Sequence, residues 1–191
     1  MVTARVASID DAPSLLEIYG HYVANTAITF ECKMPSLEEF RERIRSTLEV
    51  YPYLVAEDEG KIVGYVYANR FRPREAYDWA VELSIYIREK YHRKGIGRIL
   101  YERIERILRR QNITNVYATI VEPTSESDEY LTGESARFHE AMGYRRVAVY
   151  HGCGYKFGRW YNLVETEKIL IEKNGPPEEF IPFPKISDPM N

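Results

Sequence analysis

One stretch of this 191-residue chain, from Val81 to Gln111, restricts the possible folds more than any other. In its first part apolar residues recur at every second position, which is typical of a strand with one buried face. In its second part they recur three or four positions apart, which is typical of one side of a helix. The first set comprises Val81, Leu83, Ile85 and Ile87, and the second comprises Ile96, Ile99, Leu100, Ile104, Ile107 and Leu108. The stretch therefore predicts a strand that enters a helix through a short basic turn.

The turn contains Gly95 and Gly97, preceded by His92, Arg93 and Lys94. Glycine has no Cβ, so the backbone can bring N–H groups close to a ligand at the start of the helix, where unpaired donors and the helix dipole favour an anion. A phosphate group is the expected ligand, and a tight connection without a ligand is the alternative. The dinucleotide fingerprint is excluded because no third glycine follows, and the nucleotide-hydrolase loop because no Lys-Ser/Thr pair follows.

The turn H-R-K-G-I-G at 92–97 resembles the pyrophosphate-binding turn of the GNAT superfamily of N-acetyltransferases, with a histidine where Gln or Arg is usual. Three further segments resemble the branch that acetylates phosphinothricin and methionine sulfoximine or sulfone. They are A-Y-D-W-A-V-E at 76–82, S-A-R-F-H-E-A-M-G-Y at 135–144 and G-Y-K-F-G-R-W at 154–160. The resemblance implies a mixed α/β GNAT fold, with a mostly antiparallel central sheet, two splayed parallel strands and flanking helices.

The remaining patterns fit a single domain over residues 1–172. Strands are expected at 2–9, 53–57, 62–68, 81–87, 116–121, 144–149 and 160–170. Helices are expected after Ser8 or Asp10, after Ser36, from 96 onward and at 135–142. Gly152, Gly154 and Gly158 indicate a loop before the last strand. Several prolines in 173–191 indicate an extended C-terminal tail without regular structure.

Composition limits the classes that remain. Hydrophobic residues make up 45% of the chain and charged residues 29%, which indicates a globular protein with a substantial core. The formal net charge of -3 predicts no general affinity for nucleic acid. No run approaches the roughly 20 apolar residues that span a bilayer, so no membrane partner is expected and the cytoplasm is the default location. Cys32 and Cys153 lack metal-site spacing and are interpreted as free thiols, and no metal is expected.

The resemblance implies acetyl-coenzyme A as co-substrate, held between the splayed strands. Its pantetheine arm would pair with the edge of the central strand near Leu83, Ile85, Tyr86 and Ile87. Its pyrophosphate would lie on Arg93, Lys94, Gly95, Ile96, Gly97 and Arg98. Thr132, where relatives commonly have Asn, and Ser135 complete the expected cofactor contacts.

Glu82 and His139 are the candidate catalytic residues. An amine is mostly protonated at neutral pH, so a base must remove its proton before it attacks the thioester. Glu82 lies in an otherwise apolar strand, where desolvation would raise its pKa, although it could instead face solvent. The match to the glutamate of the branch favours the base. His139, where many relatives have Tyr, would protonate the departing thiolate; a packed histidine is the alternative, and Tyr150 and Tyr155 are further candidate donors.

The acceptor pocket is expected to form from the connector before the central strand and from the loop at 25–31. Its candidate residues are Phe30, Arg72, Arg74, Tyr77, Asp78 and Trp79. An arginine can bind an acceptor carboxylate in bidentate fashion, and Lys156 and Arg159 are further candidate cations. Simple aromatic packing is the alternative for the aromatic residues.

These features predict an N-acetyltransferase that transfers acetyl directly from acetyl-coenzyme A to the amine of a small amino acid or amino-acid analogue. The resemblance also implies a homodimer. Two alternatives remain open. The chain could be an acetyl-coenzyme A sensor without turnover, because Thr132 replaces the usual Asn. It could also acetylate a polyamine or a protein amine, because the acidic loop at 122–134 would attract a cation.

Overall fold

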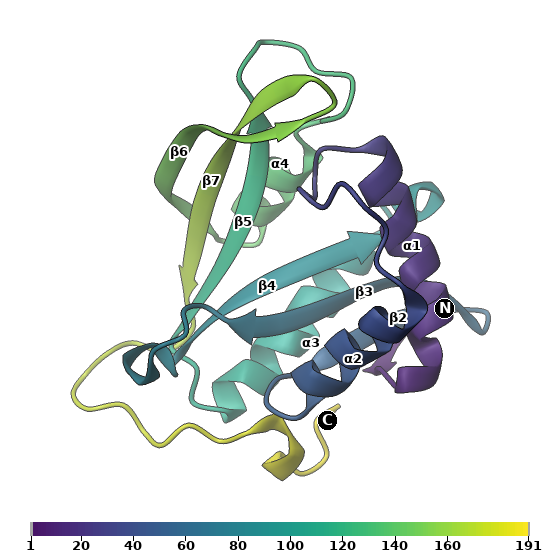
Figure 1. The fold of residues 1–191 in the computed structure, drawn as a ribbon. Helices are drawn as coiled ribbons and strands as arrows, with labels where there is room; N and C mark the ends of the chain where they lie inside the picture. Colours follow the sequence, from purple (N-terminus) through teal and green to yellow (C-terminus); the bar gives the residue numbers. More distant parts are fainter. Residues whose placement is uncertain (1, 191) are drawn as a thin grey trace.

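The computed structural model describes residues 2–190 and shows one central sheet with helices on both faces (Figure 1). Within these residues the sheet has seven strands: β1 (Thr3–Val6), β2 (Tyr53–Asp58), β3 (Lys61–Arg70), β4 (Ala80–Ile87), β5 (Asn115–Pro123), β6 (Arg145–Lys156) and β7 (Arg159–Ile169). The helices are α1 (Ala12–Asn25), α2 (Leu37–Leu48), α3 (Ile96–Arg110) and α4 (Glu134–Ala141). The four helices and seven strands agree in order with the predicted elements.

The strand order is β1-β2-β3-β4-β5-β7-β6, and every neighbouring pair is antiparallel except β4 and β5. These two strands are parallel because α3 connects them. Their pairing runs only from Ala80 with Asn115 to Glu82 with Tyr117. Figure 1 shows the two strands together at one end and diverging at the other. The mixed, mostly antiparallel sheet with splayed parallel strands confirms the predicted fold class.

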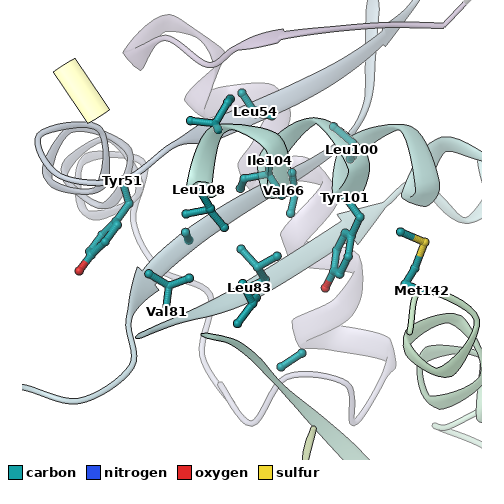
Figure 2. Packing of buried hydrophobic residues seen from close by; sticks show 14 of the residues in the cluster. Tyr51, Leu54, Val66, Val81, Leu83, Leu100, Tyr101, Ile104, Leu108 and Met142 are labelled. Carbon is teal, nitrogen blue, oxygen red and sulfur yellow. The ribbon is translucent and has the colours of Figure 1, made fainter. Parts of the chain in front are cut away.

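The two faces of the sheet have separate hydrophobic cores. On one face the buried side of α3 packs against alternate residues of β2, β3 and β4, among them Leu54, Val66 and Leu83 (Figure 2). On the other face α1 and α2 pack against a set of strand tyrosines that includes Tyr53 and Tyr65. Successive residues of a strand point to opposite faces, so β2, β3 and β4 each contribute side chains to both cores.

Helix α3 buries two residues that the apolar periodicity did not predict. Tyr101 is 0% exposed and Glu105 is 5% exposed. The Glu105 carboxylate accepts two hydrogen bonds from Lys168 Nζ, at 2.9 and 2.6 Å, and one from the Tyr144 hydroxyl. A buried carboxylate needs such a paired cation and further hydrogen bonds. Glu105 therefore ties α3 to β7 across the core.

The loop predicted around Gly152 and Gly154 is wrong, because β6 continues through both glycines to Lys156. β6 stays paired with β7, and its register shifts between Arg146 and Ala148 and again between Tyr150 and Gly154. A bulge accepts extra residues on one strand without ending the hydrogen-bonded ladder. Of the three glycines only Gly158 lies in the tight turn between the two strands, with φ of 75°.

Residues 173–190 contain no strand, and their one short helical turn is the 3-10 turn Phe183–Lys185. The segment, yellow in Figure 1, runs back along the molecule towards the end of α3. Gln111 Nε2 donates to the backbone oxygens of Val50 and Ile181, both at 2.9 Å, and Phe183 is 8% exposed. Arg103 and Arg110 of α3 donate to backbone oxygens of residues 187–190. The tail is therefore held against the sheet and α3.

Candidate active site

A groove of about 690 Å³ opens where β5 has diverged from β4. Its walls come from the end of β4, the turn into α3, the start of α3, the segment before α4 and α4 itself. Nine residues expected to contact the cofactor line it: Ile85, Ile87, Arg93, Gly95, Ile96, Gly97, Arg98, Thr132 and Ser135. The splay of two parallel strands therefore creates a cavity beside the basic glycine turn.

Each glycine of the turn has a distinct structural role. Gly95 precedes α3 in the left-handed conformation, with φ of 80°, which a residue with a Cβ adopts at a cost. Gly97 lies in the first turn of α3 against Phe138 of α4, and a Cβ there would be 2.8 Å from the Phe138 ring. The first N–H groups of α3 have no partner within the helix, so this wall of the groove favours an anion.

Three residues expected at the cofactor do not line the groove. Leu83 is buried in the core under α3, and Tyr86 is buried on the opposite face against Tyr19 and Tyr22. Lys94 lies over the ring of Tyr91, with Nζ 4.6 Å from the ring centroid. The backbone of Leu83 and Tyr86 still belongs to the part of β4 beyond its pairing with β5.

Glu134, which sequence reasoning missed, joins the two sides of the groove mouth. Its carboxylate pairs with the Arg93 guanidinium and lies 3.5 Å from His92 Nδ1. The hydrogen bond from Arg93 holds the pKa of Glu134 below its usual range. Its position at the start of α4, the end of a helix that favours a negative charge, was the available signal. Glu134 thus anchors the basic turn to α4.

His92, which stands where the family usually has Gln or Arg, contacts the last residue of β4 and a residue of α1. Its Nε2 is 3.0 Å from the Ile87 backbone oxygen and 3.1 Å from the Tyr22 hydroxyl. Tyr22 also exchanges hydrogen bonds with the Ile87 backbone, and it lines the groove from α1. Tyr22 was not predicted, because it comes from a helix 65 positions away in the sequence.

Glu82 lies at the point where the two parallel strands separate. It is the last residue of β4 that is paired with β5, opposite Tyr117, and it is also paired with Asn69 of β3. Alternation along the strand places its side chain on the face covered by α1 and α2, since Val81 and Leu83 face α3. The side chain is half-buried. Its carboxylate is therefore at the apex of the splay and partly accessible.

His139 is buried between α3 and α4, 5% exposed, and is not among the residues that line the groove. Burial lowers its pKa to about 4, so the ring is neutral at pH 7. The Ser135 backbone oxygen, 2.7 Å from Nδ1, can only accept, so Nδ1 carries the ring proton. The Tyr101 hydroxyl, 2.8 Å away, then donates to Nε2. In the free protein His139 therefore has no proton on the nitrogen that faces Tyr101.

Phe30 and the loop that carries it are held by the β6–β7 hairpin. The Phe30 ring covers Gly154, where a Cβ would lie 2.2 Å from the ring, and it packs 6.3 Å from the Tyr161 ring. Lys156 is 4% exposed, and its Nζ donates to the backbone oxygens of Thr26 and Thr29, both at 2.8 Å. Burial lowers the pKa of Lys156. From the sequence Lys156 was predicted only as a candidate partner for an acceptor carboxylate, whereas in the structure its hydrogen bonds hold the loop at 25–31 in place.

Three residues of the connector at 71–79 lie close to Tyr117, the β5 partner of Glu82. Phe71 stacks on Tyr117, 3.9 Å between ring centroids, and Tyr77 packs at the edge of Phe71. The Arg72 guanidinium lies 4.2 Å over the Phe71 ring and pairs with Glu165 at 3.2 Å. Phe71, Arg72 and Tyr77 are thus gathered beside Tyr117, the neighbour of Glu82.

The other connector residues have different surroundings. Asp78 pairs with Arg70 at 3.2 Å, and Arg74 is exposed. Trp79 donates its Nε1 proton to the Glu178 backbone oxygen of the tail, at 2.7 Å. Tyr77 and Trp79 line a separate cavity of about 540 Å³, to which residues 171–178 also contribute. The chain therefore does not bring all six predicted acceptor residues into one pocket.

The acidic loop that connects β5 to α4 is largely neutralised by arginines. Glu122 pairs with Arg146, and Asp128 and Glu129 both pair with Arg159. These contacts fasten the loop to the β6–β7 hairpin. Most of the negative charge of this loop is therefore balanced by arginines of the same chain. Little of it is left to attract a cationic acceptor such as a polyamine.

Among residues 2–190 no group of three or more His, Cys, Asp or Glu side chains is arranged to hold a metal ion. In the same range no helix is long and apolar enough to cross a membrane.

A match to a known family decides what kind of protein this is. Residues 5–164 match the model of the acetyltransferase (GNAT) domain. The chain belongs to the GNAT acetyltransferase family. The groove, the glycine turn and Glu82 of this GNAT N-acetyltransferase all lie within the matched residues.

Relatives of this GNAT protein are similar over most of its length. The phosphinothricin N-acetyltransferase of Alcaligenes faecalis is 37% identical over 173 residues, which covers 88% of this chain and 82% of that protein. The L-methionine sulfoximine/L-methionine sulfone acetyltransferase of Salmonella typhimurium is 29% identical over 176 residues, which covers 92% and 98%. A solved phosphinothricin acetyltransferase from Sinorhizobium meliloti in complex with acetyl-CoA is 32% identical, with a TM-score of 0.85 and coverage of 95% and 96%.

Proposed function

We propose that this N-acetyltransferase transfers acetyl from acetyl-coenzyme A to the amine of a small amino acid or amino-acid analogue, such as phosphinothricin or methionine sulfone. The names of the similar proteins support this class of acceptor. The observation that carries the proposal is the position of Glu82, a half-buried carboxylate where β4 and β5 separate beside the groove.

The groove suits the chemical groups of the coenzyme. Acetyl-coenzyme A would supply the acetyl group as a thioester, which an amine can attack. Its phosphates fit the N–H groups at the start of α3, with Arg93 and Arg98 beside them. β4 has no β5 partner beyond Glu82, so the backbone groups of Leu83 and Ile85 on that edge can hydrogen-bond an amide-bearing arm, whereas the Ile87 backbone is held by Tyr22 and His92.

Glu82 acts on the acceptor. An ammonium group that reaches the apex of the splay would donate a proton to the Glu82 carboxylate, and the neutral amine would then have the lone pair that forms the new C–N bond. As this bond forms, the C–S bond of the thioester would break, and the departing sulfur would take the second proton of the attacking nitrogen and leave as the free thiol. The ammonium also gains electrostatically from the nearby carboxylate, which orients it before transfer.

The test is the Glu82→Gln variant. General-base catalysis contributes about a hundredfold to ten-thousandfold, so kcat should fall by that range while the KM for acetyl-coenzyme A stays within about twofold. Release of free thiol is measured from about pH 6 to about pH 9 with phosphinothricin, methionine sulfone and methionine as acceptors. Activity of the wild type that is equal over this pH range, or a variant with unchanged kcat, would contradict the role of Glu82.

His139 we propose to be a positioning residue, in contrast to the proton donor expected from the sequence. Its Nδ1 proton is held by Ser135, and Tyr101 donates to its Nε2, so the pair fixes α4 on α3 beneath the groove. The His139→Gln variant should then retain kcat within about tenfold, the range left when a positioning hydrogen bond is altered. A loss as large as that of Glu82→Gln would restore the donor role.

A homodimer and a cytoplasmic location complete the proposal. The β6–β7 hairpin at the sheet edge carries several exposed apolar side chains: Val147, Val149, Tyr150, Tyr155, Trp160 and Ile169. Exposed apolar residues that cluster in this way support an interface. Cys32 and Cys153 are exposed free thiols, which suits a reducing compartment. Sedimentation that shows a stable monomer at micromolar concentration would contradict the dimer.

A further inference from the structure

We propose that a second cavity, on the α1 and α2 face of the sheet, receives the side chain of the acceptor and selects an uncharged, oxygen-bearing group. We call it the tyrosine cavity, and the residues that carry the argument are Tyr19, Arg43, Tyr53, Tyr65, Tyr67 and Asn69. This inference rests on the proposed function, because it places the acceptor amine at Glu82.

The tyrosine cavity has a volume of about 340 Å³, and one of its lining residues, Asn69, is the β3 partner of Glu82. In the register of β3 and β4, Asn69 lies opposite Glu82 and Tyr67 lies opposite Ser84. Directly opposed residues of antiparallel strands project from the same face, with Cβ atoms about 5 Å apart. An acceptor whose amine contacts Glu82 can therefore extend its side chain past Asn69 into the tyrosine cavity.

Stacked tyrosines form the strand wall of this cavity. The Tyr53 ring lies 4.9 Å from Tyr67 and 5.8 Å from Tyr65, at interplanar angles of 16° and 22°. Tyr86 packs edge-on against both Tyr19, which lines this cavity, and Tyr22, which lines the groove. The three rings separate the two spaces, so the acceptor side chain and the coenzyme would occupy different sides of the sheet apex.

The Tyr65 hydroxyl is the strongest indication of a missing ligand. Tyr65 is 0% exposed and lines the tyrosine cavity, yet its hydroxyl has no hydrogen-bond partner among residues 2–190. Burial raises the pKa of Tyr65 well above its usual value, so the hydroxyl is neutral and able to donate. Buried polar atoms nearly always have a partner, so a ligand oxygen or a water is expected at this hydroxyl.

The other polar groups specify the chemistry of the ligand. The Arg43 guanidinium pairs with the Glu31 carboxylate at 2.8 Å, and both residues line the cavity. Their opposite charges cancel, so the cavity does not need a charged ligand. Thr47 donates to the Asn69 side-chain oxygen at 3.4 Å, which leaves the Asn69 NH₂ group to serve as a donor. Donors therefore outnumber acceptors, while Arg43 repels a second cation and Glu31 a second carboxylate. A sulfonyl, sulfoxide or carboxamide oxygen therefore fits better than the ionised phosphinate of phosphinothricin, so within the proposed class of acceptors the cavity favours the sulfone over phosphinothricin.

The decisive experiment compares L-methionine sulfone with L-methionine, which differ only in the sulfur oxygens. In the wild type we expect a higher kcat/KM for the sulfone. In Tyr65→Phe the preference for the sulfone should fall by roughly tenfold, the value of one buried hydrogen bond, while kcat/KM for methionine changes little. The KM for acetyl-coenzyme A should stay the same in both proteins.

A second measurement does not depend on turnover. Calorimetry of L-methionine sulfone binding, with coenzyme A present, should give a Kd roughly tenfold weaker for Tyr65→Phe than for the wild type. The melting temperature of Tyr65→Phe should equal or exceed that of the wild type, because the lost hydroxyl has no protein partner. The matched control is Tyr51→Phe, which removes a buried hydroxyl under the α3 face and should leave both ligands unaffected.

The outcomes separate the two proposals. A wild type that binds the sulfone but releases no thiol with any acceptor contradicts the proposed function and not the cavity. An active wild type whose sulfone preference and sulfone Kd are unchanged in Tyr65→Phe overturns the cavity as the selecting site. Equal losses for methionine and the sulfone, or a lowered melting temperature, also overturn it, because they assign the hydroxyl to the fold.

Discussion

The groove and the acceptor side of Glu82 are built from the chain in opposite ways. The groove takes almost all its walls from two continuous stretches, 85–98 and 132–142. The acceptor side combines α1, α2, β3, the connector at 71–79, Tyr117 and the β6–β7 hairpin. A site made from adjacent residues leaves a readable pattern in the sequence, whereas one made from distant segments is defined only once they pack. The following variants test whether the two regions are also independent in function.

Gly97→Ala should have the largest effect, and it should be confined to the groove. The added Cβ would lie 2.8 Å from Phe138, and overpacking of this kind costs about 1–3 kcal/mol. We expect the KM for acetyl-coenzyme A to rise by roughly ten- to a hundredfold, with the KM of the amine unchanged. The double variant Gly97→Ala/Phe138→Leu should recover most of the loss, because leucine withdraws the ring. If the KM for acetyl-coenzyme A does not recover in the double variant, the effect of Gly97→Ala does not come from the contact with Phe138.

Lys156→Met should affect the acceptor side alone. The change keeps most of the side-chain volume but leaves the buried backbone oxygens of Thr26 and Thr29 without their donor, at a cost of about 2–3 kcal/mol in the free energy of unfolding. The loop that carries Phe30 should loosen, so the KM of the amine rises while that of acetyl-coenzyme A stays constant. Urea unfolding and steady-state kinetics check this, with exposed Lys173→Met as the control. A matching rise in both KM values would break the proposed independence.

His139 should make stability depend on pH in a predictable direction. Its folded pKa of about 4 lies below the ordinary value of 6.5, so between these values the unfolded chain binds a proton that the folded chain does not. Stability is therefore complete above pH 6.5 and falls as the pH decreases towards 4. From about pH 7.5 to about pH 5 the loss is roughly 2 kcal/mol. Urea unfolding at these pH values checks the slope, and His139→Gln should flatten it. An equal slope in both proteins would assign it to carboxylates instead.

Some parts of the fold could be predicted from the sequence and others could not, and the difference has a physical reason. The strand, the glycine turn and α3 were predicted because period-two and period-3.6 patterns follow directly from backbone geometry. The continuation of β6 through Gly152 and Gly154 was missed, because glycine stops a strand in isolation but not beside a paired partner. The burial of Glu105 was also missed, since its partner Lys168 is 63 positions away.

The residues of the candidate site also divide into those that the sequence predicted correctly and those whose surroundings it did not predict. Nine of the twelve expected cofactor residues line the groove, because the turn and the helix that follows it are contiguous. Trp79 was expected beside the acceptor, but its indole N–H holds the tail at Glu178, a contact between residues 99 positions apart. His139 was expected to face the thioester, and the structure surrounds it with Tyr101 and Ser135. A side chain's partners depend on which helix covers it, and periodicity carries no information on that choice.

The amino-acid sequence was sufficient to define the family resemblance, the order of the elements and an anion-binding turn beside a strand that carries Glu82. Only the packed chain revealed where that strand loses its β5 neighbour, that Lys156 clamps the loop of Phe30, and that Tyr65 is buried without a partner. The reason is that backbone patterns arise from neighbours within a few residues, which the sequence lists in order. Burial, register and cavities arise from contacts between distant segments, and those exist only in the folded molecule.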